Sequence, residues 1–91
     1  MAEPSITMKL MRAAHVGRET HETHAVHVDG RDTGIVTIAV RGPDTYRAEI
    51  RRDGEITPIH SEEELAWAVA NAAQAWSEQQ GSKDDEGRAD N

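Results

Sequence analysis

The sequence predicts an α+β fold, in which an antiparallel meander of four or five strands is followed by one C-terminal helix packed on one face. Before residue 60, short runs alternate between apolar and polar residues, a pattern typical of half-buried strands. Clusters of Gly, Asp and Pro separate these runs and favour tight turns. After residue 60, apolar residues recur at helical spacing. Because every expected connection is short, no crossover between strands is required.

The first two strands are expected over residues 5–12 and 23–28. The first run places apolar residues at every second position (Ile6, Met8 and Leu10), and the second places Val26 and Val28 on one face. Between them, residues 15–22 lose the alternation, and we expect a polar connection there.

The third strand is expected over residues 35–41, after a hairpin turn at 29–34. It is the run richest in β-branched residues, with Val36, Ile38 and Val40 on one face, and such residues favour strands. The turn Gly42-Pro43-Asp44 follows, and strand pairing should stop there because proline cannot donate a ladder hydrogen bond.

The fourth strand directs Tyr46, Ala48 and Ile50 to one side, and it ends at the turn formers Asp53-Gly54. A two-residue loop would pair Ile50 with Thr57, whereas a three-residue loop with a bulge would pair Ile50 with Ile56. Burying both isoleucines together favours the bulged register. Pro58 should end the last strand or mark it as an edge.

The helix is expected from Ser61 to residue 80. Ser61 and Glu64 form a capping box, in which each side chain accepts a hydrogen bond from the other residue's amide. One face then carries the residues expected to pack on the sheet (Leu65, Val69, Ala72 and Trp76, flanked by Ala68 and Ala73). Gly81 is expected to end the helix in a left-handed conformation.

Residues 1–80 are expected to form one domain and residues 81–91 a disordered acidic tail, since the tail has no large apolar side chain. With no Phe and 91 residues, the core should be thin, so a homodimer would bury more surface. The absence of Cys excludes disulfides and thiolate metal sites. Residues 1–10 lack the apolar run of a signal peptide or membrane span, and we expect a cytoplasmic protein without membrane contact.

Four histidines lie close together in the sequence, at His15, His21, His24 and His27. Imidazole binds zinc, so a metal- or proton-sensing domain is one hypothesis. However, His24 and His27 should point to opposite faces of a strand, and no catalytic acid, base or nucleophile set is evident. We expect no metal, no cofactor and no enzymatic activity.

The fourth strand also carries arginines on the side away from Tyr46. Arg47 and Arg51 share this face, with Arg41 and Arg52 near its ends. Together with the Asp53-Gly54 turn and the Ser61-Glu62-Glu63-Glu64 opening of an Ala-rich helix, the run Tyr46-Arg47-Ala48-Glu49-Ile50-Arg51 loosely resembles the three-strand-plus-helix DNA-binding domains of tyrosine-recombinase arms and plant ethylene-response factors. The resemblance implies a sheet face that reads a DNA groove. The alternative is a solvated face on which Glu49 and Glu55 pair with the arginines.

Trp67 is the main clue to function. At 100° per residue it lies about 200° from Leu65 around the helix, on the polar side with Asn71 and Gln74, and exposed tryptophans are enriched at protein interfaces. The net charge is −7, and the helix concentrates carboxylates at its start (Glu62, Glu63 and Glu64). We therefore expect a small noncatalytic regulatory protein that binds a protein partner, for example as an inhibitor of a basic, nucleic-acid-binding target of the phage or mobile-element type. The expected contacts are Trp67, Asn71, Gln74, Glu62, Glu63, Arg47 and Arg51, and the alternative is a nucleic-acid-binding module that uses the arginine face.

Overall fold

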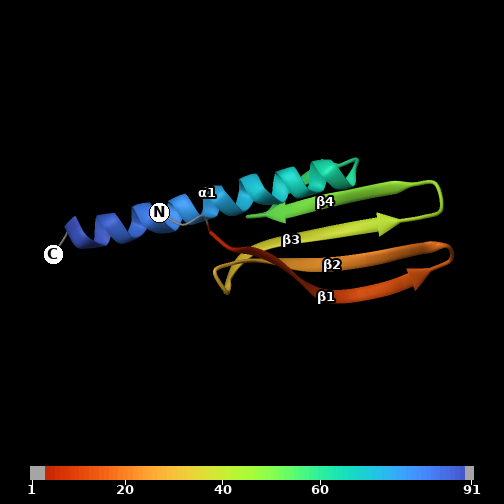
Figure 1. Cartoon of the computed structure of the whole chain (residues 1–91), viewed down its shortest axis with the longest axis horizontal. Helices are drawn as coiled ribbons and strands as arrows, with labels where there is room; N and C mark the ends of the chain where they lie inside the picture. The colour runs from red at the N-terminus through yellow and green to blue at the C-terminus, as the bar shows by residue number, and fades with distance from the viewer. Residues whose placement is uncertain (1–3, 90–91) are drawn as a thin grey trace.

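The computed structural model describes the backbone of residues 4–89 and the side chains of residues 4–80. Five strands, β1 (Ile6–Val16), β2 (Glu19–Val28), β3 (Arg31–Arg41), β4 (Tyr46–Arg52) and β5 (Glu55–Ile59), are followed by the helix α1 (Glu62–Ala89). The strands form one antiparallel sheet in the order β1-β2-β3-β4-β5. Figure 1 shows α1 lying along one face of this sheet. The predicted fold class is therefore confirmed.

The histidine-rich segment is part of the sheet, so the predicted polar connection over 15–22 is wrong. β1 and β2 continue to a tight turn at Gly17-Arg18, where Val16 pairs with Glu19. Gly17 adopts a φ of 63°, which glycine reaches without strain. Because this part of the sheet lies beyond the helix, as Figure 1 shows for the β1–β2 and β3–β4 hairpin tips, its side chains need no apolar alternation. The sequence of this segment therefore lacks the alternating pattern by which a half-buried strand is recognised.

The predicted register of the β4–β5 hairpin is also wrong. Ile50 pairs with Thr57 and Arg51 with Ile56, so the loop has two residues. Asp53 and Gly54 take φ values of 51° and 83°, the left-handed pair of a type I′ turn whose twist matches that of the strands. The turn geometry overrides the pairing of two isoleucines, and Ile56 is left 59% exposed.

Pro58 lies within β5 opposite Glu49, and β5 is the edge strand that the proline predicts. The turn after β2 is shorter than the predicted 29–34 segment. It consists of Asp29-Gly30, because Val28 already pairs with Arg31. By contrast, β3 ends at Arg41, before the Gly42-Pro43-Asp44 turn, as predicted.

The core lies between α1 and the sheet face that it covers. It is aliphatic and thin, as expected, and consists of Val26, Val28, Ile35, Ile50, Ile59, Leu65, Val69 and Ala73, with Ala48, Ala68, Ala72 and Trp76 partly buried against it. On β3, the residues on this face are Ile35, Thr37 and Ala39, all at most 3% exposed. Since side chains alternate along a strand, Val36 and Ile38 lie on the opposite face, away from the helix.

The start of α1 follows the predicted cap. The Glu64 amide donates to the Ser61 hydroxyl oxygen at 3.1 Å. The Glu64 carboxylate accepts from the His60 amide at 3.1 Å rather than from the Ser61 amide, so the box closes one residue earlier than predicted.

The predicted end of the helix at Gly81 is wrong, because α1 continues to Ala89. An internal glycine costs a helix only about 1 kcal/mol, and no proline follows it. Figure 1 shows this end of α1 extending past the sheet. The predicted division into a domain over 1–80 and a disordered acidic tail over 81–91 stays a prediction, and residues 90–91 lie outside the described part.

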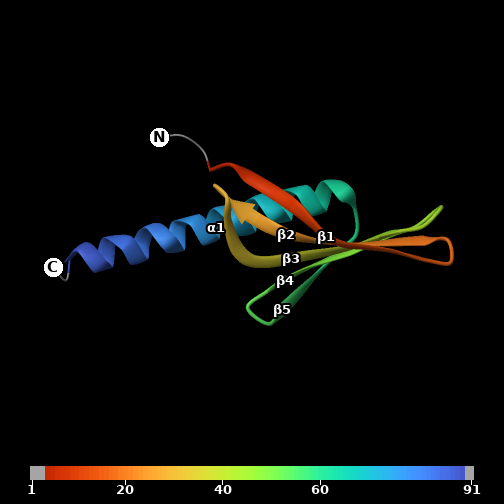
Figure 2. The same ribbon diagram turned by 90° about the horizontal axis from the view of Figure 1, so that it is seen from below.

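The helix lies over β2, β3 and β4. In Figure 2, the two edge strands β1 and β5 lie on opposite sides of the twisted sheet. Each edge therefore leaves a strip of the helix-side face beside α1.

Candidate functional site

A groove separates α1 from the edge strand β5 and is the candidate site. Its volume is about 260 Å³. The lining comes from β4 and β5 (Ile50, Arg52, Glu55 and Thr57) and from α1 (Trp67, Ala68, Asn71 and Ala72). We call this feature the α1–β5 groove. It has an apolar floor with polar groups around it, the usual composition of a binding site.

Trp67 forms the rim of the α1–β5 groove. Its side chain is 71% exposed, the largest exposure among the large apolar residues of the described chain. The next turn of the helix places Asn71 in the same wall, where its amide donates to the Trp67 carbonyl oxygen at 3.0 Å. The prediction that Trp67 lies outside the core, on the side of Asn71, is confirmed. Its role as a partner contact stays a prediction.

The β4–β5 register creates the groove. In the observed two-residue hairpin, Thr57 lies opposite Ile50, so its small side chain faces the helix. In the bulged register Ile56 would occupy that position, and its larger side chain would fill much of the space.

Sequence reasoning missed the groove residues Arg52, Glu55 and Thr57 because it chose the other register. The signal that could have found them is the Asp53-Gly54 pair itself, which favours type I′ turns. Arg52 and Glu55 flank this turn as a directly opposed pair, and opposite charges at such positions stabilise the register.

Gln74, also predicted as a contact, is exposed but does not line the groove. Gln74 is on the same side of the helix as Trp67 but two turns further along the axis. The structure thus brings together Trp67 and Asn71 and leaves Gln74 apart.

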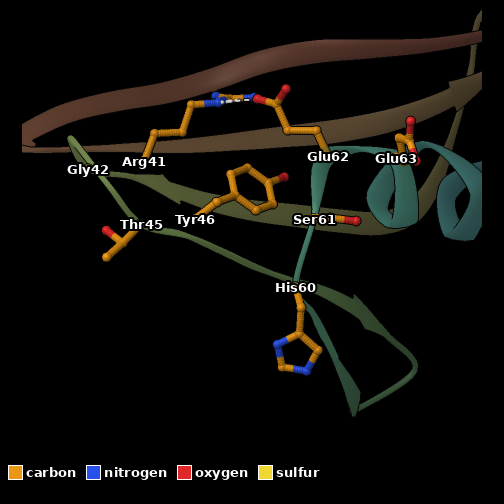
Figure 3. Close-up of a pocket in the computed structure, with 8 residues that line it drawn as sticks. All are labelled: Arg41, Gly42, Thr45, Tyr46, His60, Ser61, Glu62 and Glu63. Atoms are coloured by element: carbon orange, nitrogen blue, oxygen red, sulfur yellow. Dashed lines mark hydrogen bonds and ion pairs between the residues drawn. The ribbon is translucent and has the colours of Figure 1, made fainter.

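Glu62 and Glu63 lie at the start of α1, beside a second depression of about 470 Å³. Glu62 accepts a hydrogen bond from Arg41 Nε at 2.8 Å, and Arg41 also pairs with Glu22. Figure 3 shows Arg41 and Glu62 reaching toward each other beside the Tyr46 ring, whereas Thr45 and His60 point away. With its positive charge neutralised by two carboxylates, Arg41 is poorly placed to bind an additional anion.

Tyr46 lies beside Arg41 and Glu62 in the second depression (Figure 3). The Arg41 guanidinium lies 5.6 Å from the centre of the Tyr46 ring. The Tyr46 hydroxyl oxygen is buried and has no hydrogen-bond partner among the described residues. Burial raises the pKa of Tyr46, which the Arg41 charge partly offsets. Hydrogen bonding to Glu62 raises the pKa of Arg41.

The arginines of the open sheet face have carboxylate partners. Arg47 donates to Glu19 at 3.2 Å, and Arg51 donates to Glu49 at 2.8 Å. Arg47 and Arg51 do share one face of β4, as the alternation predicts. Binding DNA phosphates would require these pairs to exchange partners, so the face offers less free positive charge than the sequence suggests.

The histidines are spread over the sheet. His24 lies opposite Thr37 and His27 opposite Asp32, on opposite faces as expected. His15 lies 3.3 Å from the Thr20 hydroxyl oxygen, and His21 lies 3.4 Å from Glu19. In the part of the chain that the structure describes, no three His, Asp or Glu side chains converge in a metal-binding arrangement. Within residues 4–89, no helix is long and apolar enough to cross a membrane.

Comparison with known proteins gives no relative. The chain matches no family model, no curated protein and no solved structure.

Proposed function

We propose that this protein is a noncatalytic binding module that recognises a protein partner through the α1–β5 groove. The observation that carries the proposal is Trp67, an indole 71% exposed at the rim of a groove whose floor includes Ile50 and Ala68. Exposing so large an apolar ring is unfavourable in a monomer, and tryptophan is among the residues that contribute most to interfaces. A partner side chain or short segment seated in the groove would bury it.

The charge of the molecule favours a basic partner. The net charge is −7, and the first turn of α1 is acidic (Glu62, Glu63 and Glu64). Opposite charges on a partner would accelerate association and select against acidic competitors. An inhibitor that covers the basic surface of a nucleic-acid-binding protein has this chemistry, and we propose this class of target.

The β5 edge favours insertion of side chains over addition of a long strand. The pair that flanks the two-residue turn, Arg52 and Glu55, is a hydrogen-bonded pair. Hydrogen-bonded and non-hydrogen-bonded pairs alternate along an antiparallel ladder. Ile56 and Pro58 therefore belong to non-hydrogen-bonded pairs and direct their main-chain groups away from β4. Pro58 has no amide to donate. Ile56 therefore supplies the one outward amide of β5, which limits strand addition at this edge.

The test is capture from extracts of the native host with three immobilised forms: wild type, Trp67→Ala and Gln74→Ala. Gln74 is the matched control, because it is exposed on the same helix but outside the groove. The expected result is a basic protein retained by wild type and Gln74→Ala and lost with Trp67→Ala. Raising the salt concentration should weaken its retention.

Two results would contradict the proposal. One is equal capture of the same protein by all three forms, which would place the contact elsewhere. The other is binding of this chain itself to immobilised DNA, with that binding lost in the Arg47→Ala and Arg51→Ala variants. This result would favour the nucleic-acid-binding alternative.

A further inference from the structure

The edge strand β1 presents open main-chain groups over residues 6–10. Val28 and Arg31 flank the two-residue Asp29-Gly30 turn, so Val28 directs its N–H and C=O toward β3. Its neighbour on the other side is Ile6, which must then direct its own groups away from β2. The hydrogen bond from the Asp29 amide to the Ser5 carbonyl oxygen, at 2.8 Å, agrees with this alternation.

Met8 and Leu10 repeat the arrangement of Ile6. They lie opposite Val26 and His24, two and four residues along the strand, so their N–H and C=O groups also point outward. Three residues thus offer six main-chain hydrogen-bonding groups at this edge.

The side chains of the same three residues form an uncovered apolar strip. Ile6, Met8 and Leu10 are 36%, 38% and 51% exposed. They lie on the face that α1 covers, because Ile6 and Met8 are opposite the core residues Val28 and Val26. The helix lies over β2, β3 and β4 and leaves this strip beside it.

The edge lacks the protection that β5 has. β5 has five residues and contains Pro58, and short edge strands with proline resist pairing. Residues 5–10 contain no proline and a single charge, Lys9. The open stretch ends at Leu10, because the ladder shifts register between Leu10 and Arg12.

We propose that a second copy of this chain pairs with β1 in antiparallel orientation, with the two-fold axis at Met8. This register places Met8 against Met8 of the second copy and Ile6 against Leu10 of the second copy. It also sets Lys9 against Thr7 of the second copy. An axis at Lys9 would oppose the two ammonium groups, and like charges directly opposite each other are unfavourable.

The spacing of the strip selects a second copy as the occupant. The apolar residues at 6, 8 and 10 are spaced symmetrically about Met8. A two-fold axis at Met8 therefore places every apolar side chain of the strip opposite an apolar side chain of the second copy. The two sheets then become continuous, and both helices lie on the same face because the axis is perpendicular to the sheet. The apolar strips of the two copies cover each other between the helices.

Charge distinguishes this contact from the proposed partner site. Each copy carries −7, so the two molecules repel each other as whole bodies, and added salt should strengthen the dimer by screening this repulsion. The basic partner of the α1–β5 groove should respond to salt in the opposite way.

Sedimentation equilibrium of the full chain tests the proposal, with loading from about 1 μM to about 1 mM, the range that suits a small interface. The wild-type mass should rise toward that of a dimer. Met8→Lys should weaken dimerisation by at least about tenfold, because it places like charges at the axis. Met11→Lys is the matched control: Met11 is 62% exposed and lies at the register shift, so dimerisation should change by less than about twofold.

Mixing Met8→Lys with Met8→Glu should restore a dimer, because opposite charges then meet at the axis. Thermal melting of each variant establishes that it folds. A monomeric wild type over the whole range would overturn the proposal. So would equal weakening by Met8→Lys and Met11→Lys, failure of the mixed pair to associate, or a dimer abolished by Trp67→Ala instead.

Discussion

Replacing Thr37 by Val should stabilise the protein, although it removes a polar group from a natural sequence. Thr37 lies in the middle of β3 on the helix-covered face and is 1% exposed. Its hydroxyl oxygen is buried and has no hydrogen-bond partner among the described residues. An unsatisfied buried polar group costs about 1–3 kcal/mol, and valine has nearly the same shape. We expect a gain of about 1 kcal/mol, the low end of that range, which corresponds to about 4–8 °C in Tm for a domain of this size.

Thr33→Val is the matched control on the same strand. The Thr33 hydroxyl donates to the Val26 carbonyl oxygen at 2.8 Å and accepts from the Ile35 amide at 3.1 Å. The same substitution there leaves two partly buried main-chain groups without a partner, and the expected loss is about 1–3 kcal/mol. Thr33 is only partly buried, whereas Thr37 is fully buried, but the opposite signs expected for the two variants follow from whether the hydroxyl has a hydrogen-bond partner.

The assay is urea unfolding at one fixed protein concentration, followed by far-ultraviolet circular dichroism. The midpoint should rise for Thr37→Val and fall for Thr33→Val at an unchanged m-value. If Thr37→Val lowered the midpoint, or if both variants moved it in the same direction, the placement of Thr37 beneath α1 would be refuted.

Three further predictions concern Tyr46, the helix cap at Ser61 and Trp67 at the rim of the α1–β5 groove. Tyr46→Phe should raise the free energy of unfolding by up to about 1 kcal/mol at neutral pH, because the lost hydroxyl is buried without a partner among the described residues. Burial raises the pKa of Tyr46 in the folded state, so folding favours the protonated hydroxyl. This contribution to the free energy of unfolding is complete below the unfolded pKa of about 10. It is lost as the pH rises through the folded pKa. The fall in Tm above this pH should be smaller in the Phe variant, and an identical fall would contradict the burial. Ser61→Ala should cost about 1 kcal/mol in urea unfolding by removing the helix cap, whereas no loss would mean that the cap is not formed. Trp67→Ala should change stability by less than about 0.5 kcal/mol, and a loss comparable with that of a core residue would show that Trp67 is packed inside.

The fold class was predictable because its signals are local and agree with one another. Ser61 and Glu64 mark the start of α1, and the Leu65–Val69 spacing identifies its buried face. The helical angle was enough to place Trp67 outside the core, since the rotation between two positions on a helix depends only on their separation in the sequence.

The errors arose where tertiary context or turn geometry overrode hydrophobic pattern. The strand around His21 lies beyond the helix, so nothing selects for apolar residues there, and pattern alone cannot detect it. At Asp53-Gly54, the left-handed turn fixed the register at the cost of exposing Ile56. Ile59 is a core residue that lies beyond Pro58, so the proline marks β5 as an edge strand without ending it.

The candidate site could be predicted only in part. Trp67 and Asn71 follow from the helix alone, but the opposite wall of the α1–β5 groove depends on the β4–β5 register. The ion pair between Arg47 and Glu19 joins residues 28 positions apart in the sequence. Such long-range pairing cannot be derived from local sequence, and it changes how the arginine face is interpreted.

The most direct test of the account is whether Trp67 becomes buried when the partner binds. In a Trp76→Phe background, Trp67 is the sole tryptophan of the chain, so its fluorescence can be selected in a complex by using a partner prepared without tryptophan. Acrylamide should quench it efficiently in the free protein, since the side chain is 71% exposed. On saturation with the captured partner, we expect a blue shift of the emission and a marked fall in quenching. Unchanged emission and quenching in the saturated complex would contradict it.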